Sequence, residues 1–184
     1  MKQISTWFAT FLMSASMAVV AVAADSPAST TGPGGQASPD RVSKLFEVMR
    51  AGKYQEQVLF PELEWEDIPA LLKLGGSKIV LKTFPREGLS SQYEPECSEG
   101  MVALWLIEGL RLGKRPPLNA LCLPPGPFEG NWGEVSEKNH QRVLQAYRTW
   151  WSKVQLLPRE KAMAADPLDG AKLYWHGSPS TSRH

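Results

Sequence analysis

Residues 97–113 read C-S-E-G-M-V-A-L-W-L-I-E-G-L-R-L-G, the longest apolar run that follows the extreme N-terminus. Residues spaced by three and four positions define one face of a predicted helix: Met101, Leu104, Trp105, Glu108 and Leu112. Apolar residues fill its other faces too, so we expect other elements to cover it on nearly every side. Glu99 lies near its start and Arg111 near its end, as the helix dipole favours, and Gly113 provides a typical stop. The stretch therefore predicts a buried central helix.

Apolar residues at helical spacing predict three further helices, at residues 39–52, 64–75 and 134–157. The last of these is strongly amphipathic, with apolar residues recurring at three and four positions and charged residues on the other side. We therefore predict an all-α fold, in which a single domain of about four helices surrounds the buried central helix.

The remaining segments are less regular. Residues 77–84 favour a strand by propensity but are too few to distinguish an extended segment from a short helix. Residues 113–132 hold too many prolines and glycines for a regular element and predict a long loop. Residues 159–165 can add a short helical turn, and the apolar residues 173–175 are expected to pack back on the core.

The N-terminal 24 residues have the pattern of a secretory signal peptide, with Lys2, an uncharged apolar stretch and small residues at its end. The alternative is an uncleaved anchor, although the stretch is near the short limit for spanning a bilayer. Residues 25–38 are small, polar and rich in Pro and Gly, which predicts a flexible tether. We place the helical globular domain at residues 39–176 and a disordered tail at residues 177–184. The expected location is periplasmic or extracellular, with no transmembrane span after signal cleavage.

Charge argues against two classes of partner. Cleavage of the signal would remove Lys2 and no acid, so that 19 of the 20 basic residues remain against 19 acidic ones. A formally neutral chain without a Lys/Arg-rich run has no electrostatic footprint for nucleic acid or for an anionic membrane surface. We therefore expect a partner of another kind.

Cys97 and Cys122 are the only cysteines of the chain. In an exported protein two cysteines predict a disulfide, which here would link the start of the central helix to the segment that follows it. The chain-entropy argument assigns such a loop roughly 3 kcal/mol of stability. The alternative is a pair of buried thiols.

The sequence contains no motif that identifies a catalytic or metal site. The histidines, His140, His176 and His184, show no ligand spacing with either cysteine, so we expect neither a metal nor another cofactor. A triad of His140, Asp67 and a serine at residue 90 or 91 is conceivable. The sequence around these serines lacks the G-x-S-x-G motif of a nucleophile elbow, which argues against it. We assign no catalytic residue.

Four residues are candidates for binding. Glu108 is a carboxylate on a helix that we expect to be buried, where it either pairs with Arg111 or Arg115 or serves as a functional acid. Arg115 opens the proline-rich loop, and Trp132 lies near that loop's end. Trp151 follows another tryptophan directly, and the two cannot both face inward. Exposed tryptophans can stack on sugars or anchor protein partners.

Four segments resemble a family of small exported bacterial proteins of unknown function. They read L-F-P-E-L-E-W-E-D-I-P-A-L-L-K-L from residue 59, K-T-F-P-R-E-G-L-S-S from residue 82, C-S-E-G-M-V-A-L-W-L-I-E-G-L-R from residue 97 and D-P-L-D-G from residue 166. The resemblance covers roughly residues 53–175. It implies an exported, single helical domain, and it brings no catalytic residue, cofactor or partner.

These observations favour a non-enzymatic binding or protein-interaction module whose partner is an envelope or extracellular protein or a glycan. The alternative is a hydrolase-type enzyme that uses an acid at or near Glu108. A deep pocket surrounded by Glu108, Arg115 and Trp132 would favour the enzyme.

Overall fold

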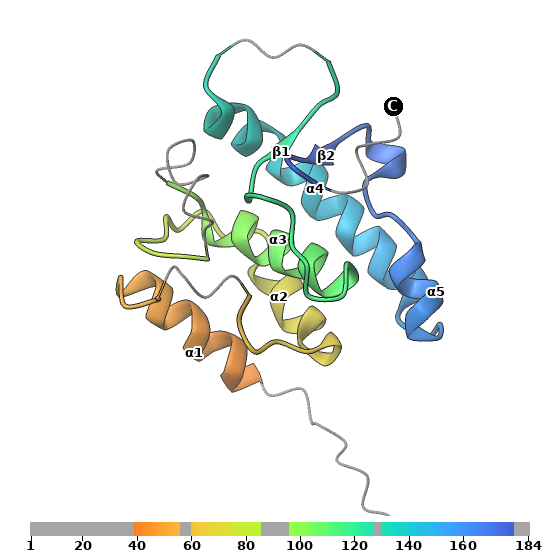
Figure 1. Ribbon diagram of the computed structural model, residues 1–184, viewed down its shortest axis with the longest axis horizontal. Coiled ribbons are helices and arrows are strands. Elements are labelled where there is room, and N and C mark those ends of the chain that lie inside the picture. Colours follow the sequence, from red (N-terminus) through yellow and green to blue (C-terminus); the bar gives the residue numbers. More distant parts are fainter. Residues whose placement is uncertain (1–38, 56–59, 86–95, 127–129, 179–184) are drawn as a thin grey trace, which may run out of the picture. The chain divides into compact units, whose positions relative to one another are not determined.

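Helices make up most of the computed structural model, which describes residues 39–55, 60–85, 96–126 and 130–178 (Figure 1). Within these ranges there are five α-helices: α1 (Pro39–Arg50), α2 (Ile68–Leu74), α3 (Glu99–Arg111), α4 (Trp132–Val154) and α5 (Arg159–Ala164). The two strands β1 (Cys122–Leu123) and β2 (Tyr174–Trp175) form a minimal antiparallel sheet. All of these elements belong to one unit of the chain, residues 35–184. The predicted all-α class is confirmed.

Helix α3 is the centre of this unit, as predicted, and all 13 of its residues are buried. It packs against α2, α4 and α5, and α1 is in contact with α2 (Figure 1). Ser98 caps its N-terminus by accepting a hydrogen bond from Met101 N. Gly109 lets a neighbour come close, because a Cβ atom there would lie 2.2 Å from the ring of Phe60. Gly113 then takes a left-handed conformation with φ of 71° beyond the helix end.

Helix α4 is the longest element, with 23 residues. Its buried stripe recurs at three and four positions and comprises Val143, Leu144, Tyr147, Trp150 and Val154. It begins two residues before the predicted start, because the Asn131 side chain accepts hydrogen bonds from Gly133 N and Glu134 N and so forms a cap. Helix α4 therefore presents one face to α3 and leaves the others toward the C-terminal segment and solvent.

The small sheet is a departure from the prediction. Residues 113–132 were expected to hold no regular element, yet β1 lies within them and pairs Cys122 with Trp175 and Leu123 with Tyr174. A hydrogen bond from His176 N to Leu121 O, 2.9 Å long, extends the pairing. The pairing joins segments about fifty residues apart, so it leaves no local pattern in the sequence. It fixes the C-terminal segment against α4.

A backbone bridge and side-chain burial settle the predictions for two shorter segments. Val80 and Ser98 form an antiparallel bridge, so the segment around Val80 is extended and not helical. Residues 173–175 do pack on the core, where Trp175 is buried.

The predicted Cys97–Cys122 disulfide is absent from the structure, although both cysteines are buried. The two residues belong to different local structures. Cys97 precedes α3 and its carbonyl accepts a hydrogen bond from Leu81 N, whereas Cys122 N in β1 donates to Ser136 Oγ of α4. Burial raises the pKa of the Cys122 thiol well above its ordinary value.

The predicted signal peptide and tether lie outside the described residues, as does most of the predicted tail. Among the described helices, none combines the length and the apolar character that a membrane span requires.

Candidate functional site

Glu108 lies in a buried network that links α3, α4 and β2. Its carboxylate receives two hydrogen bonds from Arg111, at 2.8 Å from Nε and 2.6 Å from Nη2, and a third at 2.6 Å from Tyr147 Oη. Trp175 Nε1 donates to the same phenol oxygen at 2.8 Å. Arg111 also donates to the carbonyl of Met163 at 2.9 Å. Of the two ion-pair partners predicted for Glu108, Arg111 and Arg115, the structure therefore shows Arg111.

Burial and the carboxylate of Glu108 shift the pKa values of the two side chains that donate to it. Burial alone would lower the pKa of Arg111, but the hydrogen bonds and charge of Glu108 raise it above its ordinary value. Burial also raises the pKa of Tyr147, and the negative charge of Glu108 adds to that effect. Every carboxylate oxygen of Glu108 is engaged and only 2 % of the residue is exposed. The residue is thus placed to hold three elements together.

The other sequence candidates lie apart from one another. Arg115 is exposed in the loop after α3. Trp132 occupies the first turn of α4, where its ring meets that of His176 edge-on at 4.6 Å. Trp151 is half-buried, and its ring centroid lies 5.8 Å from that of Trp65. The structure does not gather Glu108, Arg115 and Trp132 around a common pocket.

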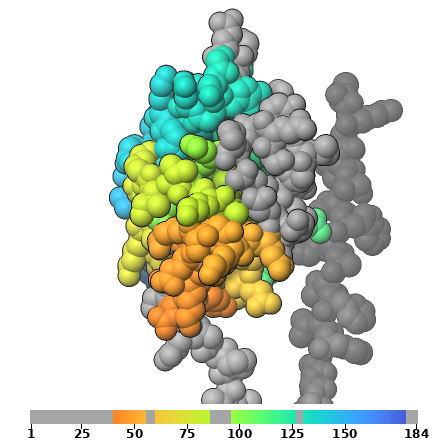
Figure 2. Space-filling model, turned by 90° about the vertical axis from the view of Figure 1, so that its left-hand side faces the viewer, coloured from red at the N-terminus to blue at the C-terminus, as the bar shows by residue number. Residues whose placement is uncertain are grey.

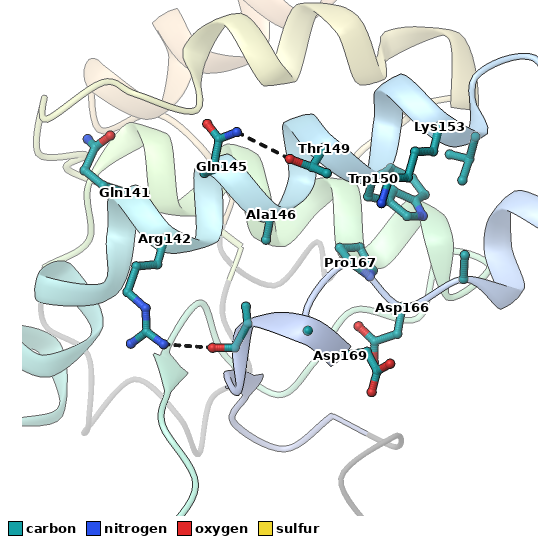
Figure 3. A pocket seen from close by; sticks show the side chains of 14 residues that line it. Gln141, Arg142, Gln145, Ala146, Thr149, Trp150, Lys153, Asp166, Pro167 and Asp169 are labelled. Carbon is teal, nitrogen blue, oxygen red and sulfur yellow. Dashed lines mark hydrogen bonds between the residues drawn. The ribbon is translucent and has the colours of Figure 1, made fainter.

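An open groove of about 720 Å³ runs between α4 and residues 165–171 (Figure 3). Its α4 wall includes Gln141, Arg142, Gln145, Ala146, Thr149 and Trp150. Lys153 and Val154 complete that wall toward the end of the helix. None of the four residues singled out from the sequence lines the groove.

Helical spacing explains why α4 forms one wall. Arg142, Ala146 and Lys153 follow one another at intervals of four and seven residues and therefore share a face. Arg142 Nη2 donates to Ala171 O at 2.8 Å, which ties the two walls together at one end. On the opposite wall, the Asp166 side chain accepts from Leu168 N at 2.8 Å and fixes the turn there.

Trp150 lies at the other end of the groove, beside Lys153 (Figure 3). The residue is 5 % exposed, and its indole Nε1 is buried with no hydrogen-bond acceptor among the described residues. A buried donor that lacks a partner costs about 1–3 kcal/mol. The groove therefore ends beside a side chain whose polar atom is buried and has no partner among the described residues.

The charges of the groove balance. Arg142 and Lys153 supply two positive charges, and Asp166 and Asp169 supply two negative ones. Gln141, Gln145 and Thr149 add groups that can both donate and accept, while Ala146 and Pro167 are apolar. This combination suits a neutral ligand with alternating donors and acceptors better than an ion.

A second polar cluster, which sequence reasoning missed, connects the start of α3 to α4. Glu137 accepts from Lys78 Nζ at 2.7 Å and from Ser98 Oγ at 2.6 Å. His140 Nε2 donates to Gly75 O at 2.6 Å, and its Nδ1 lies 2.5 Å from Lys78 Nζ. Partial burial raises the pKa of Glu137, but hydrogen bonds from His140, Lys78 and Ser98 outweigh it and lower the pKa to about 2.

This cluster replaces the triad considered from the sequence. His140 is fully buried and contacts Gly75, Lys78 and Glu137, whereas Asp67 pairs with Arg41 at 3.3 Å. The serines at residues 90–91 lie outside the described residues. Across the described part of the chain, His, Cys, Asp and Glu side chains form no group that could hold a metal ion.

Comparison with known proteins places the chain in a family without assigning an activity. A family model described as a domain of unknown function, DUF4943, matches residues 36–176. The expected relation to a family of unknown function is thereby confirmed. No curated protein and no solved structure matches the chain significantly.

Proposed function

The chain belongs to this family of unknown function, and we propose that it is a non-enzymatic, exported binding module that holds a segment of a partner protein in the groove between α4 and residues 165–171. The observation that carries the proposal is the groove itself, with the buried indole N–H of Trp150 at one end. The export part of the proposal rests on the signal-peptide pattern of residues 1–24.

The dimensions of the groove favour an extended peptide. Its α4 wall spans Gln141 to Val154, which at 1.5 Å per residue is roughly 20 Å. An extended peptide of about six residues covers that length. Backbone carbonyls and amides of such a peptide alternate as acceptors and donors, and they match the glutamine and threonine side chains of this wall.

A peptide suits the groove better than a glycan. Stacking on a sugar requires an exposed aromatic face, and Trp150, the tryptophan in the groove wall, is 5 % exposed. Of the envelope or extracellular partners considered, a protein is therefore favoured over a glycan.

The hydrolase alternative draws no support from Glu108. Both carboxylate oxygens are bound to Arg111 or Tyr147, and Glu108 does not line the groove. A general acid must reach the substrate and exchange a proton with it. A buried carboxylate with three donors is better suited to stability than to that role.

A random library of extended hexapeptides, displayed on phage, tests the proposal. Sequences selected on the wild-type protein should be uncharged or weakly charged, and their synthetic copies should change its tryptophan fluorescence on binding. Thr149→Phe places a ring in the groove wall and should weaken binding at least tenfold. Arg148→Phe is the matched control, because Arg148 is also exposed, is adjacent to Thr149 on α4 and does not line the groove. Failure to select any peptide, or equal loss in both variants, would contradict the proposal.

A further inference from the structure

We infer that the extended segment at residues 77–81 is a docking edge for a β-strand of a partner protein, separate from the groove. The segment lies antiparallel to the residues that lead into α3, with Val80 opposite Ser98. The segment is thus hydrogen-bonded along one edge, and we propose that the partner strand pairs with its other edge.

The inner edge of the segment makes three hydrogen bonds to residues 97–100. Ser77 O accepts from Gly100 N at 3.1 Å, and Ile79 O accepts from Glu99 N at 2.7 Å. Leu81 N donates to Cys97 O at 3.0 Å. Because backbone groups alternate along a strand, the N–H and C=O groups of the residues between these three point to the opposite edge.

The outer edge is formed by Lys78 and Val80. Their backbone N–H and C=O groups make no hydrogen bond with any part of the chain that the structure describes. Ile79 and Val80 are 52 % and 54 % exposed, although both have β-branched side chains typical of paired strands. Figure 2 shows this region, in yellow-green, at the surface between α1 in orange and the start of α4 in cyan. Four backbone groups and two apolar side chains are therefore available to an added strand.

The side chains around this edge indicate what the added strand carries. Lys78, Val80 and Lys82 alternate with Ile79 and Leu81, and Lys82 is exposed and makes no ion pair with the described residues. A partner strand with an apolar residue opposite Val80 and an acidic residue near Lys82 complements this pattern.

A second copy of the chain would not complement Lys82. Antiparallel pairing of two such edges about Val80 would bring Lys82 of one copy toward Lys78 of the other, and Lys78 is already paired with Glu137 at 2.7 Å, so Lys82 would gain no counter-ion there. The occupant is therefore a segment of a different protein. The docking edge at residues 77–81 shares no residue with the groove wall, so a binding test at one surface does not decide the result at the other.

Amide hydrogen exchange of the full chain, measured by NMR, tests the inference. The probe is the peptide acetyl-Glu-Val-Thr-Val-Glu-amide, which is acidic at both ends and extended, and a copy methylated on every amide nitrogen is its control. In the unbound protein the Val80 amide should exchange much faster than the Leu81 amide. Millimolar peptide should slow exchange at Val80 at least fivefold, and the methylated copy should leave it unchanged.

Two variants provide a second measurement. Val80→Pro removes the outward N–H without removing the bonds made by Ile79 O and Leu81 N, whereas Val80→Thr keeps the N–H and the branched shape. Peptide binding should be lost in the first and kept in the second. The inference is overturned if Val80 exchange does not respond to the peptide, or if the methylated copy protects it equally.

Discussion

Glu108 and Arg111, one turn apart on α3, form a two-point hydrogen-bonded ion pair in which both side chains are more than nine-tenths buried. Removing one partner of such a pair leaves an uncompensated buried charge, which typically costs about 3–5 kcal/mol. We expect Glu108→Leu to lower the free energy of unfolding by that amount in urea titrations. Tyr147→Phe, which removes one donor to the same carboxylate, should cost about 1–2 kcal/mol.

The double variant Glu108→Leu/Arg111→Met is the control for this interpretation. If the cost of Glu108→Leu comes from the charge left on Arg111, removing both charges should restore part of the stability. If the double variant loses as much stability as Glu108→Leu and Arg111→Met lose together, the pair does not act as a unit.

Acid should destabilise the protein through Glu137. The folded state keeps this carboxylate ionised until the pH falls to about 2, whereas the unfolded state takes up the proton near 4.5. Between these values the unfolded state binds more protons, so this contribution to stability is complete above pH 4.5 and is lost as the pH falls toward 2. Urea unfolding at a series of pH values should show the decline.

Glu137→Gln should flatten that decline relative to wild type, because the residue no longer titrates. Glu134→Gln is the matched control, since Glu134 is exposed in the first turn of the same helix and should leave the slope in place. Identical acid profiles for Glu137→Gln and the wild type would rule out this role.

The cysteines should react with an alkylating reagent only after unfolding. Cys122 is fully buried and its thiol pKa is raised, so the native protein offers it neither access nor thiolate. Mass spectrometry of protein unfolded without a reductant should show two alkylations per chain, because no disulfide joins Cys122 to Cys97. A chain that becomes alkylated only after reduction would instead support the bridge predicted from the sequence.

Gly109 should not tolerate a methyl group. A Cβ atom there would lie 2.2 Å from the ring of Phe60, and overpacking of this kind costs about 1–3 kcal/mol. Gly133→Ala, near the start of α4, is the comparison: its Cβ would meet only the Asn131 side chain, at 3.4 Å, and helix propensity favours alanine. Thermal unfolding should separate the two variants, and equal midpoints would contradict the packing described for α3.

The sequence predicted those features that depend on neighbours within a few turns. Helix α3 and the pairing of Glu108 with Arg111 follow from spacings of three and four, and Trp150 and Trp151 indeed divide between a buried and a half-buried position. The groove, by contrast, requires residues 165–171 to return against α4.

Distant contacts explain the other omissions. The bond from Tyr147 to Glu108 joins residues 39 apart, and that from Lys78 to His140 joins residues 62 apart. None of these four side chains differs in type or spacing from an ordinary residue of an amphipathic segment. Only the packing of the whole unit brings them together, so these contacts carry no periodic signal.

The central claim is that the groove between α4 and residues 165–171 binds a peptide, and the most direct measurement is the position of that peptide on the protein. Backbone amide shifts should be mapped by NMR during titration with the tightest hexapeptide from the library. We predict that the largest changes fall within residues 141–154 and 165–171, together with the indole N–H of Trp150. Changes confined to other parts of the described chain, with Trp150 unaffected, would contradict the account.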